Sequence, residues 1–488
     1  MDSRFLDDLL HETKQIGLRP DRLKTHFKRF SSFAQRGWKN HTFVIKASCK
    51  VTNQRILSYK SISLLPQGND FSGIASFIPA AGSSTRFINP LFEAFSGGRH
   101  PNLLADWILP PGFEKHSDLG SLAKLLRTPK ALFPCVREGM TFLELKCREH
   151  KAIQGLDSLI FVSPWKYSDR FQKHAQETMA AAGTALSCLE QGPDLSTVRV
   201  NKQGHPVKGE QDQVSPVPSG HGALLELFPR VRKLFPSTEA LFIRNIDNMV
   251  GCGEEPMKVT RTFLSFYKLL LRNVQGIRDA IRRGLMGMAS SLVAELVEQL
   301  PQRDLTPQEN IALEDFDMES RPLVSLLLTL FQTPLGLLKR DSLPSLYARP
   351  LNLLGQVPNS GKDKGGTPVI IESSVGDLAI CLELPHMNET ERDDFFSDPA
   401  KATHFNPVFA VVEAVDDLTT YRLDEHPYWI FAEKAWRGSK VYYHESLLYE
   451  LIGNSEMANL VFCEVPRSVF NPNKSLDDTK EKKLADWL

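Results

Sequence analysis

The stretch "FIPAAGSSTRF", residues 77–87, combines residue types that can bind phosphate. A short apolar run ends at Pro79, and the loop that follows is Ala80, Ala81, Gly82, Ser83, Ser84, Thr85 and Arg86. Backbone N–H groups of such a turn can bind phosphate oxygens, and a guanidinium can fork onto them. The loop matches neither G-x-x-x-x-G-K-[ST] nor G-x-G-x-x-G. The residues alone leave two interpretations, a phosphate-binding loop or a polar turn after a buried strand.

Two charged residues elsewhere could serve the same anion. Lys130 follows Pro129 in "TPKALFP", where its ammonium group could face the loop or lie on a solvated surface. Asp247 ends an apolar run in "FIRNIDNMVG". A carboxylate there suits Mg²⁺, which takes one or two carboxylates together with phosphate oxygens. The alternative is that Asn245, Asp247 and Asn248 only form a turn after a strand, because Asn and Asp favour turns.

The segment "PSGHGALLELF", residues 218–228, places an imidazole between two residues without side chains. Gly220 and Gly222 could let a base or a sugar approach the backbone, and His221 could hydrogen-bond to it. The alternative is an ordinary loop before a helix.

These candidates need elements that bring them together. "GIASFIPA", "SLIFVSP" and "ALFIRNID" look like buried strands, whereas "TFLELKCREHKAIQ" and "DRFQKHAQETMAAAG" look helical. Strands that alternate with helices predict an α/β architecture with a largely parallel sheet. Ligands of open α/β sheets bind beyond the carboxyl ends of strands, which is where the loop and Asp247 lie.

The pattern along the chain predicts four parts. Residues 1–70 form an N-terminal extension that is helical over 4–37, and 71–253 form an α/β domain. Residues 254–340 have a helix-forming composition with almost no strand signal, which indicates a helical insertion. Residues 341–488 return to strand-like runs, "PVIIESS", "LAICLEL", "FAVVEAV" and "ANLVFCEVP", and residues 355–367 are predicted to be a loop.

Composition excludes some classes of function. The chain has 488 residues, 42% of them hydrophobic, which is enough for a large core and for two or three domains. Lys+Arg and Asp+Glu both number 58, so the formal net charge is zero. General binders of nucleic acid or membrane surfaces usually carry a basic excess. We therefore expect neither partner, and any anion site must be local.

The cysteines and the apolar runs point to a soluble protein. The seven cysteines contain no C-x-x-C pair, which argues against a zinc site or a disulfide framework. The N-terminus, "MDSRFLDDLLHETK", is too charged for a signal peptide. The longest strongly apolar run, near "LVSLLLTLF", is far shorter than the roughly 20 residues of a membrane-spanning helix. We expect a cytoplasmic protein, and the sequence does not indicate its oligomeric state.

Several motifs together resemble those of the sugar-nucleotide pyrophosphorylases. "PAAGSSTRF" followed by "TPKALFP" resembles their A-A-G-x-G-T-R … P-K signature, with Ser84 in place of the second glycine. Three later segments resemble motifs of the UTP–sugar-1-phosphate uridylyltransferases in the same order: "PSGHGALLELF" (P-x-G-H-G), "FIRNIDNMVG" (N-x-D-N) and "CEVPRSVFNPNKSLDD" (P-R-S-R-F-x-P-V-K-T-x-x-D-L). The whole chain also resembles a family of bacterial proteins catalogued as a domain of unknown function, through its N-terminal helical segment, "THFNPV" and "FNPNKSLDD".

This resemblance implies a Rossmann-like nucleotidyltransferase fold of the glycosyltransferase-A type, a mixed sheet flanked by helices with a helical insertion. Residues 71–253 then bind the nucleotide, and 341–488 bind the sugar phosphate and carry a C-terminal element. The implied reaction joins a nucleoside triphosphate, with UTP favoured, to a sugar 1-phosphate. Pyrophosphate is released, and Mg²⁺ is the implied cofactor.

The resemblance also implies roles for individual residues. The implied catalytic cations are Arg86, Lys130 and Lys474, although Lys474 could equally be a charged residue of the tail. The nucleotide is bound by residues 80–85 together with Gly220, His221 and Gly222, and the metal is bound by Asp247. The implied sugar contacts are Asn245, Glu372 and Asn406.

Other classes of function stay open. A non-catalytic protein on the same fold could bind a nucleotide or a sugar phosphate as a sensor. Ser84 and the helical insertion favour that divergence, whereas the presence of Lys130, Asp247 and Lys474 together favours an enzyme. A phosphotransferase on the same type of sheet is disfavoured because the chain has no Walker loop.

Overall fold

The structure is a computed structural model. It describes residues 3–46, 55–82, 87–90, 110, 125, 128–165, 167–179, 185–209, 213–301, 303–360, 365–398, 400–421, 423, 426–436 and 438–488. For residues 3–8, Met179, Ala185, Asn406 and Thr420 only the backbone is described.

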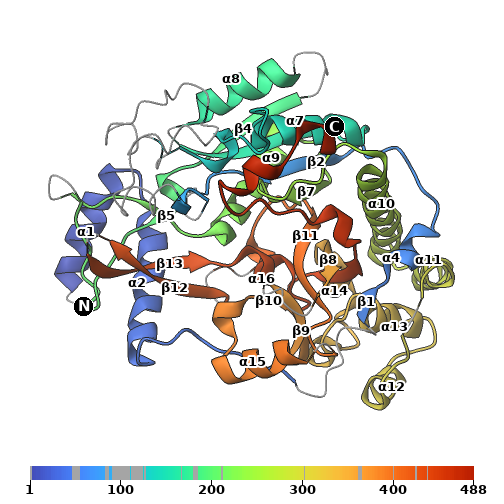
Figure 1. The fold of residues 1–488 in the computed structure, drawn as a ribbon. Helices are drawn as coiled ribbons and strands as arrows, with labels where there is room; N and C mark the ends of the chain where they lie inside the picture. Colours follow the sequence, from blue (N-terminus) through green and yellow to red (C-terminus); the bar gives the residue numbers. More distant parts are fainter. Residues whose placement is uncertain are drawn as a thin grey trace.

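Within these residues, an eight-stranded sheet forms the centre of the molecule (Figure 1). Its strands, in spatial order, are β1 (Ile56–Leu57), β14 (Asn459–Glu464), β8 (Leu351–Pro358), β11 (His404–Glu413), β7 (Ala240–Arg244), β2 (Ile74–Pro79), β3 (Ser158–Pro164) and β4 (Ala185–Gln191). β11 runs antiparallel to β7 and β8, and the other neighbouring pairs are parallel. This mixed sheet flanked by helices confirms the predicted α/β class.

The sheet is buried on both faces, so alternate side chains of a strand enter two different cores. Phe242 of β7 packs against Phe263 of α10 and Phe409 of β11, with ring centroids 6.4 and 5.4 Å away. Its neighbours Leu241 and Ile243 belong to the opposite core. The continuous apolar runs seen in the sequence follow from this double burial.

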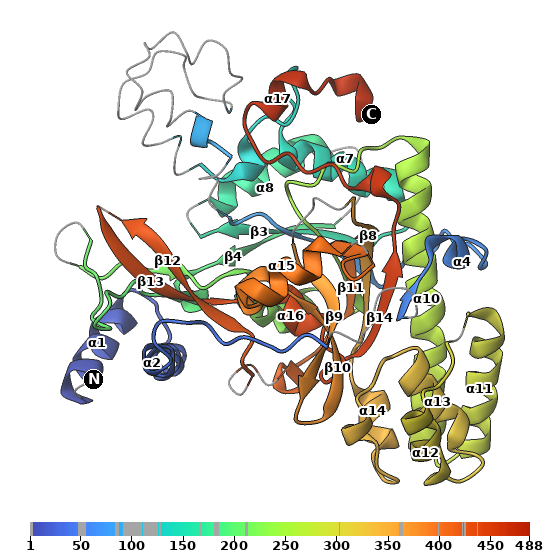
Figure 2. The ribbon, with the colours of Figure 1, turned by 60° about the horizontal axis from the view of Figure 1, so that its bottom comes forward.

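Helices cover the sheet on both sides (Figure 2). α7 (Phe142–Ile153) packs against α8 (Ser168–Met179), which lies on β3 and β4. The stretch predicted to be a helical insertion holds α10 (Glu254–Arg282), α11 (Met286–Gln299), α12 (Pro307–Glu314) and α13 (Arg321–Thr329), and α14 (Leu343–Ala348) follows it. Because α10 packs on the sheet through Phe263, this long helix is part of the main core.

The N-terminal helices pack on a hairpin from near the other end of the chain (Figures 1 and 2). These elements are α1 (Ser3–Gln15), α2 (Pro20–Gln35), β12 (Trp429–Trp436) and β13 (Ser439–Ser446). Phe30 and Phe33 of α2 each have ring centroids 5.1 Å from that of Phe431. Aromatic contacts therefore fix the N-terminal helices to the hairpin.

Shorter elements complete the described fold. Two further antiparallel pairs are β9 (Thr367–Ser373) with β10 (Gly376–Leu382), and β5 (Ser196–Thr197) with β6 (Val217–Pro218). The short helices include α4 (Tyr59–Ser63), α9 (Phe228–Leu234), α15 (Glu389–Ser397), α16 (Leu448–Ile452), α17 (Asp478–Glu481) and the 3-10 turns η2 (Lys130–Leu132) and η5 (His221–Leu227). Among the helices of the described ranges, none has the length and apolar character needed to cross a bilayer.

Candidate active site

The carboxyl ends of β7, β2, β3 and β4 lie at one edge of the sheet, because these neighbouring strands are parallel. Ala80 follows β2 at this edge and donates its backbone N–H to the carbonyl of Val162 at 2.9 Å. Ala80 and Ala81 are buried, whereas a Cβ built at Gly82 meets no described atom within 4 Å. No described residue therefore packs against Gly82 on that side. Ser83, Ser84, Thr85 and Arg86 lie outside the described residues.

Lys130, Asp247 and Lys474 meet in the structure. Asp247 lies in the turn after β7, and its Oδ2 is 3.5 Å from Lys130 Nζ. The same oxygen accepts a hydrogen bond from Lys474 Nζ at 3.0 Å. Lys130 also lies 4.6 Å from the centre of the Phe87 ring. Three residues singled out from distant parts of the sequence thus form one charged cluster.

The surroundings of the cluster set its charge. The side chain of Lys130 is 12% exposed, and burial lowers its pKa to about 8 against the opposing effect of Asp247. Lys474 is 67% exposed. Burial raises the pKa of Asp247, but Lys130 and Lys474 outweigh burial and lower it overall. An ionised carboxylate between two ammonium groups leaves one positive charge in excess, which suits phosphate oxygens.

The segment after β14 carries Lys474 into the site by pairing with the turn after β7. The backbone N–H of Asn473 donates to the carbonyl of Asp247 at 2.9 Å, and Asn248 Nδ2 donates to the carbonyl of Val469 at 2.9 Å. Lys130 Nζ donates to the carbonyl of Asn473. The N-x-D-N segment and the C-terminal segment therefore form one unit around Asp247.

A buried network centred on Glu149 of α7 fixes the same turn. Glu149 Oε2 accepts hydrogen bonds from Lys146 Nζ at 2.8 Å and Arg244 Nη1 at 3.1 Å. Its Oε1 accepts the backbone N–H groups of Val250 and Gly251 at 2.9 and 3.1 Å. The three charged side chains are 0–2% exposed. Because Arg244 precedes the turn and Val250 follows it, the network holds both ends of the stretch that presents Asp247.

The structure gives Gly220 and Gly222 a packing role. A Cβ on Gly222 would lie 2.6 Å from the backbone carbon of Ser446, and one on Gly220, which has a φ of +75°, would lie 2.7 Å from the Ser446 carbonyl oxygen. The end of β13 therefore packs against both glycines. Gln191, at the end of β4, donates its Nε2 to the carbonyl of Gly220 at 3.5 Å, which adds an amide side chain beside this segment.

A second polar cluster lies between η5, α16 and the end of β10. His221 Nδ1 accepts the backbone N–H of Leu448 at 2.9 Å, so the neutral ring carries its proton on Nε2. That nitrogen is 3.6 Å from Glu383 Oε1. The Tyr449 hydroxyl donates to Asn245 Oδ1 at 3.0 Å. Burial raises the pKa of Glu383 against the effect of His221, and its Oε1 has no hydrogen-bond partner among the described residues.

The two remaining predicted sugar contacts, Glu372 and Asn406, lie in different places. Glu372 is exposed on β9 and pairs with Asp377, whereas Glu383 follows the opposite end of the β9–β10 hairpin. Five residues separate Glu372 from that end of β9, roughly 17 Å of strand. The structure therefore does not bring Glu372 to Asn245. Asn406 lies near the start of β11, which the antiparallel pairing puts at the carboxyl edge of β7, and its side chain is outside the described atoms.

Sequence reasoning missed Glu383, Tyr449 and Gln191. A usable signal exists for Glu383 and Gln191, because Glu383 directly follows β10 and Gln191 ends β4. Nothing local marks Tyr449, which reaches Asn245 only through the placement of α16.

The residues present fit a magnesium ion only together with a substrate. Among the described residues, no group of three or more His, Cys, Asp or Glu side chains could hold a metal. Mg²⁺ at phosphate-transfer sites takes one or two carboxylates and completes its shell with phosphates and water. Both lysines contact Oδ2 of Asp247, so its Oδ1 is the oxygen that suits such an ion.

Two solved structures of UDP-glucose enzymes share this fold. A UDP-glucose phosphorylase from Trypanosoma brucei superimposes with a TM-score of 0.56 at 13% identity, covering 98% of this chain and 78% of that one. A mutant UDP-glucose pyrophosphorylase from Leishmania major, in complex with UDP-Glc, gives a TM-score of 0.56 at 12% identity, with 98% and 78% covered. At this identity the likeness shows the fold, and it confirms the fold that the motifs imply.

The chain belongs to the family described as "Domain of unknown function (DUF4301)", whose model matches residues 161–483. No curated protein matches the chain. Membership of this family, together with the fold of the UDP-sugar pyrophosphorylases, confirms the resemblance on which the sequence interpretation rests.

Proposed function

We propose that the protein is a nucleotidyltransferase that joins a nucleoside triphosphate, UTP in first place, to a sugar 1-phosphate and releases pyrophosphate. The observation that carries the proposal is the meeting of Lys130, Asp247 and Lys474 after β7, one of the parallel strands. The carboxyl edge of such strands is where open α/β sheets bind ligands. Two ammonium groups there suit a ligand with several phosphate oxygens.

The proposed chemistry needs charge neutralisation and positioning. An oxygen of the sugar 1-phosphate attacks the α-phosphorus in line and forms the new P–O bond. The bond from the α-phosphorus to the oxygen bridging the α- and β-phosphates breaks, and its electron pair leaves with pyrophosphate. No side-chain nucleophile is required, so the contributions expected of the protein are alignment and fixed positive charge.

In the proposed reaction, the internal ion pairs of Asp247 are exchanged for contacts with the substrate. Phosphate oxygens replace the Asp247 carboxylate on Lys130 and Lys474, the two cations that now hold it. The carboxylate is then available to hold Mg²⁺, and phosphate oxygens provide the remaining ligands. A bound Mg²⁺ supplies further charge for the leaving pyrophosphate. Arg86 and the loop residues 83–85 keep the phosphate-binding role proposed from the sequence.

The second polar cluster is the part of the site proposed for the sugar. Glu383 Oε1, buried and without a hydrogen-bond partner among the described residues, is suited to accept a sugar hydroxyl. We therefore give Glu383 the role that sequence order suggested for Glu372. Asn245 and the backbone position of Asn406 belong to the same proposed region, and Gln191 lies beside Gly220 for the base.

Pyrophosphate release tests this function. Purified protein is incubated with Mg²⁺, each of the common nucleoside triphosphates and a panel of sugar 1-phosphates. Turnover is expected with one pair of substrates and should be lost in Lys130→Ala, but not in Lys339→Ala, which removes an exposed lysine elsewhere. A nucleotide-dependent thermal shift without turnover on any sugar phosphate would instead support the non-catalytic binding protein. If the protein neither binds a nucleotide nor turns over any substrate pair, both the enzyme and the binding-protein proposals are overturned.

A further inference from the structure

A pocket of about 540 Å³ lies between α2, η5 and the residues Leu418, Thr419, Leu423 and His426. This is within the range of small-molecule sites, roughly 300–1,000 Å³. Its wall includes Arg19, Arg22 and Arg29 from the N-terminal helical region, and Gly222 and Glu226 from η5. None of the residues of the Lys130–Asp247–Lys474 cluster lines it. The pocket is therefore separate from the proposed phosphate site, although both adjoin the segment that holds His221.

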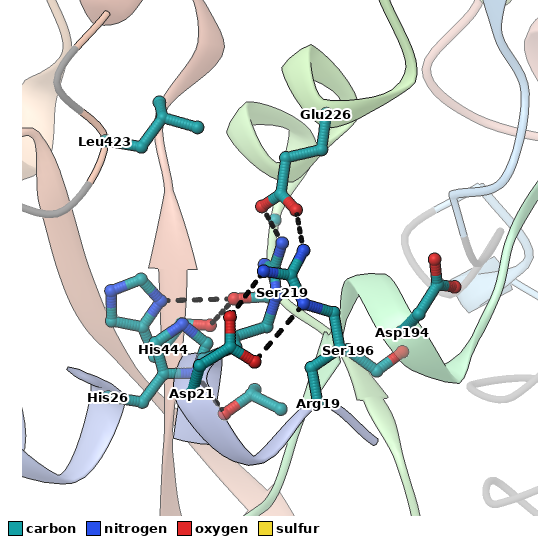
Figure 3. A network of polar contacts seen from close by, with 12 residues as sticks. Arg19, Asp21, His26, Asp194, Ser196, Ser219, Glu226, Leu423 and His444 are labelled. Carbon is teal, nitrogen blue, oxygen red and sulfur yellow. Dashed lines mark hydrogen bonds and ion pairs between the residues drawn. The ribbon is translucent and has the colours of Figure 1, made fainter. Parts of the chain in front are cut away.

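The carboxylate of Glu226 is held between two guanidinium groups at this pocket (Figure 3). Glu226 Oε2 accepts a hydrogen bond from Arg19 Nη1 at 2.6 Å, and its Oε1 contacts Arg22. Asp21, which also lines the pocket, accepts hydrogen bonds from Arg19 Nε at 3.4 Å and Nη2 at 2.5 Å. Arginine recognises carboxylate and phosphate through the same planar fork. The carboxylate of Glu226 thus occupies a place where the phosphate or carboxylate group of a ligand would also fit.

His426 adds a donor to the pocket wall. Its Nδ1 accepts the backbone N–H of Tyr428 at 3.0 Å, so the neutral ring carries its proton on Nε2. The residue is 6% exposed, and its Nε2 has no hydrogen-bond partner among the described residues. Burial lowers the pKa of His426 to about 3, so the ring is neutral at physiological pH. A buried N–H of this kind favours a ligand that brings an acceptor.

Stacked histidines connect the pocket wall to the segment before Gly220 (Figure 3). The rings of His26 and His444 lie 3.8 Å apart and nearly parallel, and burial lowers both of their pKa values well below the usual range. His444 Nε2 accepts from Arg29 at 3.0 Å, and its Nδ1 lies 3.1 Å from Ser219 Oγ. Because Ser219 directly precedes Gly220, one wall of the pocket is hydrogen-bonded to the segment that carries His221.

We propose that this pocket is a second binding site, for a small molecule that carries a phosphate or carboxylate group and competes with Glu226 for Arg19 and Arg22. Glu226 belongs to η5, which begins at His221. Loss of its ion pairs therefore frees η5 to shift and couples the pocket to the proposed active site. The inference goes beyond the proposed function, and the binding it describes does not depend on that function.

Calorimetric titration of the full chain with inorganic phosphate and with citrate tests the proposal. The wild-type protein is expected to bind at least one of them, and the double variant Arg19→Gln/Arg22→Gln should bind it at least about tenfold more weakly. Glu226→Gln removes one of two internal competitors, the carboxylate that both arginines contact, and should bind about threefold more tightly. Arg230→Gln, which breaks a nearby ion pair with Asp194 outside the pocket wall, should leave the affinity unchanged. Binding of phosphate alone or citrate alone identifies which oxyanion the site takes.

Three results would overturn the proposal. The first is no binding of either probe to the wild-type protein at millimolar concentration. The second is unchanged affinity in the double arginine variant. The third is loss of binding in Lys130→Ala, which would place the anion in the candidate active site instead. Should the double variant fail to fold, Glu226→Gln decides, because unchanged or weaker binding contradicts competition by its carboxylate.

Discussion

Glu149 and Asp247 are two carboxylates that lysine and arginine side chains contact, yet their surroundings differ. Glu149 is fully buried and its two oxygens accept four hydrogen bonds, from Lys146, Arg244 and two backbone N–H groups. Asp247 is partly exposed, and one of its two cations, Lys474, is 67% exposed. A saturated buried network costs much to open. The half-open cluster can exchange its partners for a ligand, which supports a structural role for Glu149 and the chemical role proposed for Asp247.

The largest expected effect is on stability and comes from Glu149→Gln. Glutamine keeps the shape but cannot balance Lys146 and Arg244, which stay buried without their carboxylate. We expect the free energy of unfolding to fall by about 3–5 kcal/mol, measured by urea denaturation. Glu298→Gln, at an exposed glutamate on α11, should change it by less than about 0.5 kcal/mol. A similar small change in Glu149→Gln would show that the network does not hold the turn.

Asp247→Asn should have the opposite effects, a large loss of turnover and little loss of stability. The substitution keeps the size of the side chain and removes the charge that Lys130 and Lys474 contact. Electrostatic groups at reacting phosphates are commonly worth a few kcal/mol, so turnover should fall by about 100-fold. The melting temperature should change little, because the site is partly solvated. Near-wild-type turnover at saturating Mg²⁺ would refute a role for this carboxylate in the reaction.

Glu383 is the sugar contact proposed from the structure, and Glu372 is the one predicted from the sequence. Variants of the two residues distinguish these alternatives. Glu383→Gln should raise the KM for the sugar 1-phosphate by about tenfold, because a hydrogen bond to a charged group is lost. Glu372→Gln, at the far end of the hairpin, should leave the KM unchanged. Steady-state kinetics on the two variants decides, and the opposite result would return the role to Glu372.

The smallest effect concerns a buried pair next to Glu383. His386 Nδ1 lies 2.7 Å from Glu450 Oε2, and both side chains are fully buried. Burial lowers the pKa of His386, but Glu450 outweighs burial and raises it overall. The folded state then binds this proton more tightly than the unfolded state does. The stabilisation is complete below the unfolded pKa of about 6.5 and is lost as pH rises through the folded value.

Urea titrations at about pH 6 and about pH 8 measure this contribution. The wild-type protein should lose more stability over that interval than Glu450→Gln does, because the variant lacks the carboxylate that raises the His386 pKa. Equal losses in the two proteins would show that the pair carries no pH dependence. Other titrating groups are common to both proteins and cancel in the difference.

The parts of the fold that sequence reasoning recovered are those with two buried faces. β2, β3 and β7 are continuous apolar runs, so their pattern identified them. The hairpin β12–β13 was not predicted, because its strands mix aromatic with charged residues such as Glu433 and Lys434 and are exposed over part of their length. β8 was also missed. Residues 355–367 were predicted to be a loop, whereas β8 continues to Pro358.

Two glycines have packing neighbours that the sequence could not show. A Cβ at Gly355 would lie 2.9 Å from the Phe263 ring, so this glycine serves the packing of α10 on a strand. Gly222 likewise serves the packing of Ser446. A sequence shows that a glycine is present but not which neighbour approaches it. Asp247 was recognisable because it lies at the end of an apolar run, three residues after β7, whereas the contact between Tyr449 and Asn245 exists only once α16 is in place.

The pairing of the segment after β14 with the turn after β7 also has a consequence for translation. The hydrogen bond from Lys130 to the carbonyl of Asn473 joins residues 343 positions apart in the chain. Contacts of such long range form late, because a large loop must close first. Lys130 and Asp247 leave the ribosome well before Lys474, so a nascent chain holds the carboxylate with one of its two lysines missing. A product truncated before residue 474 would retain most of the sheet and still lack the proposed activity.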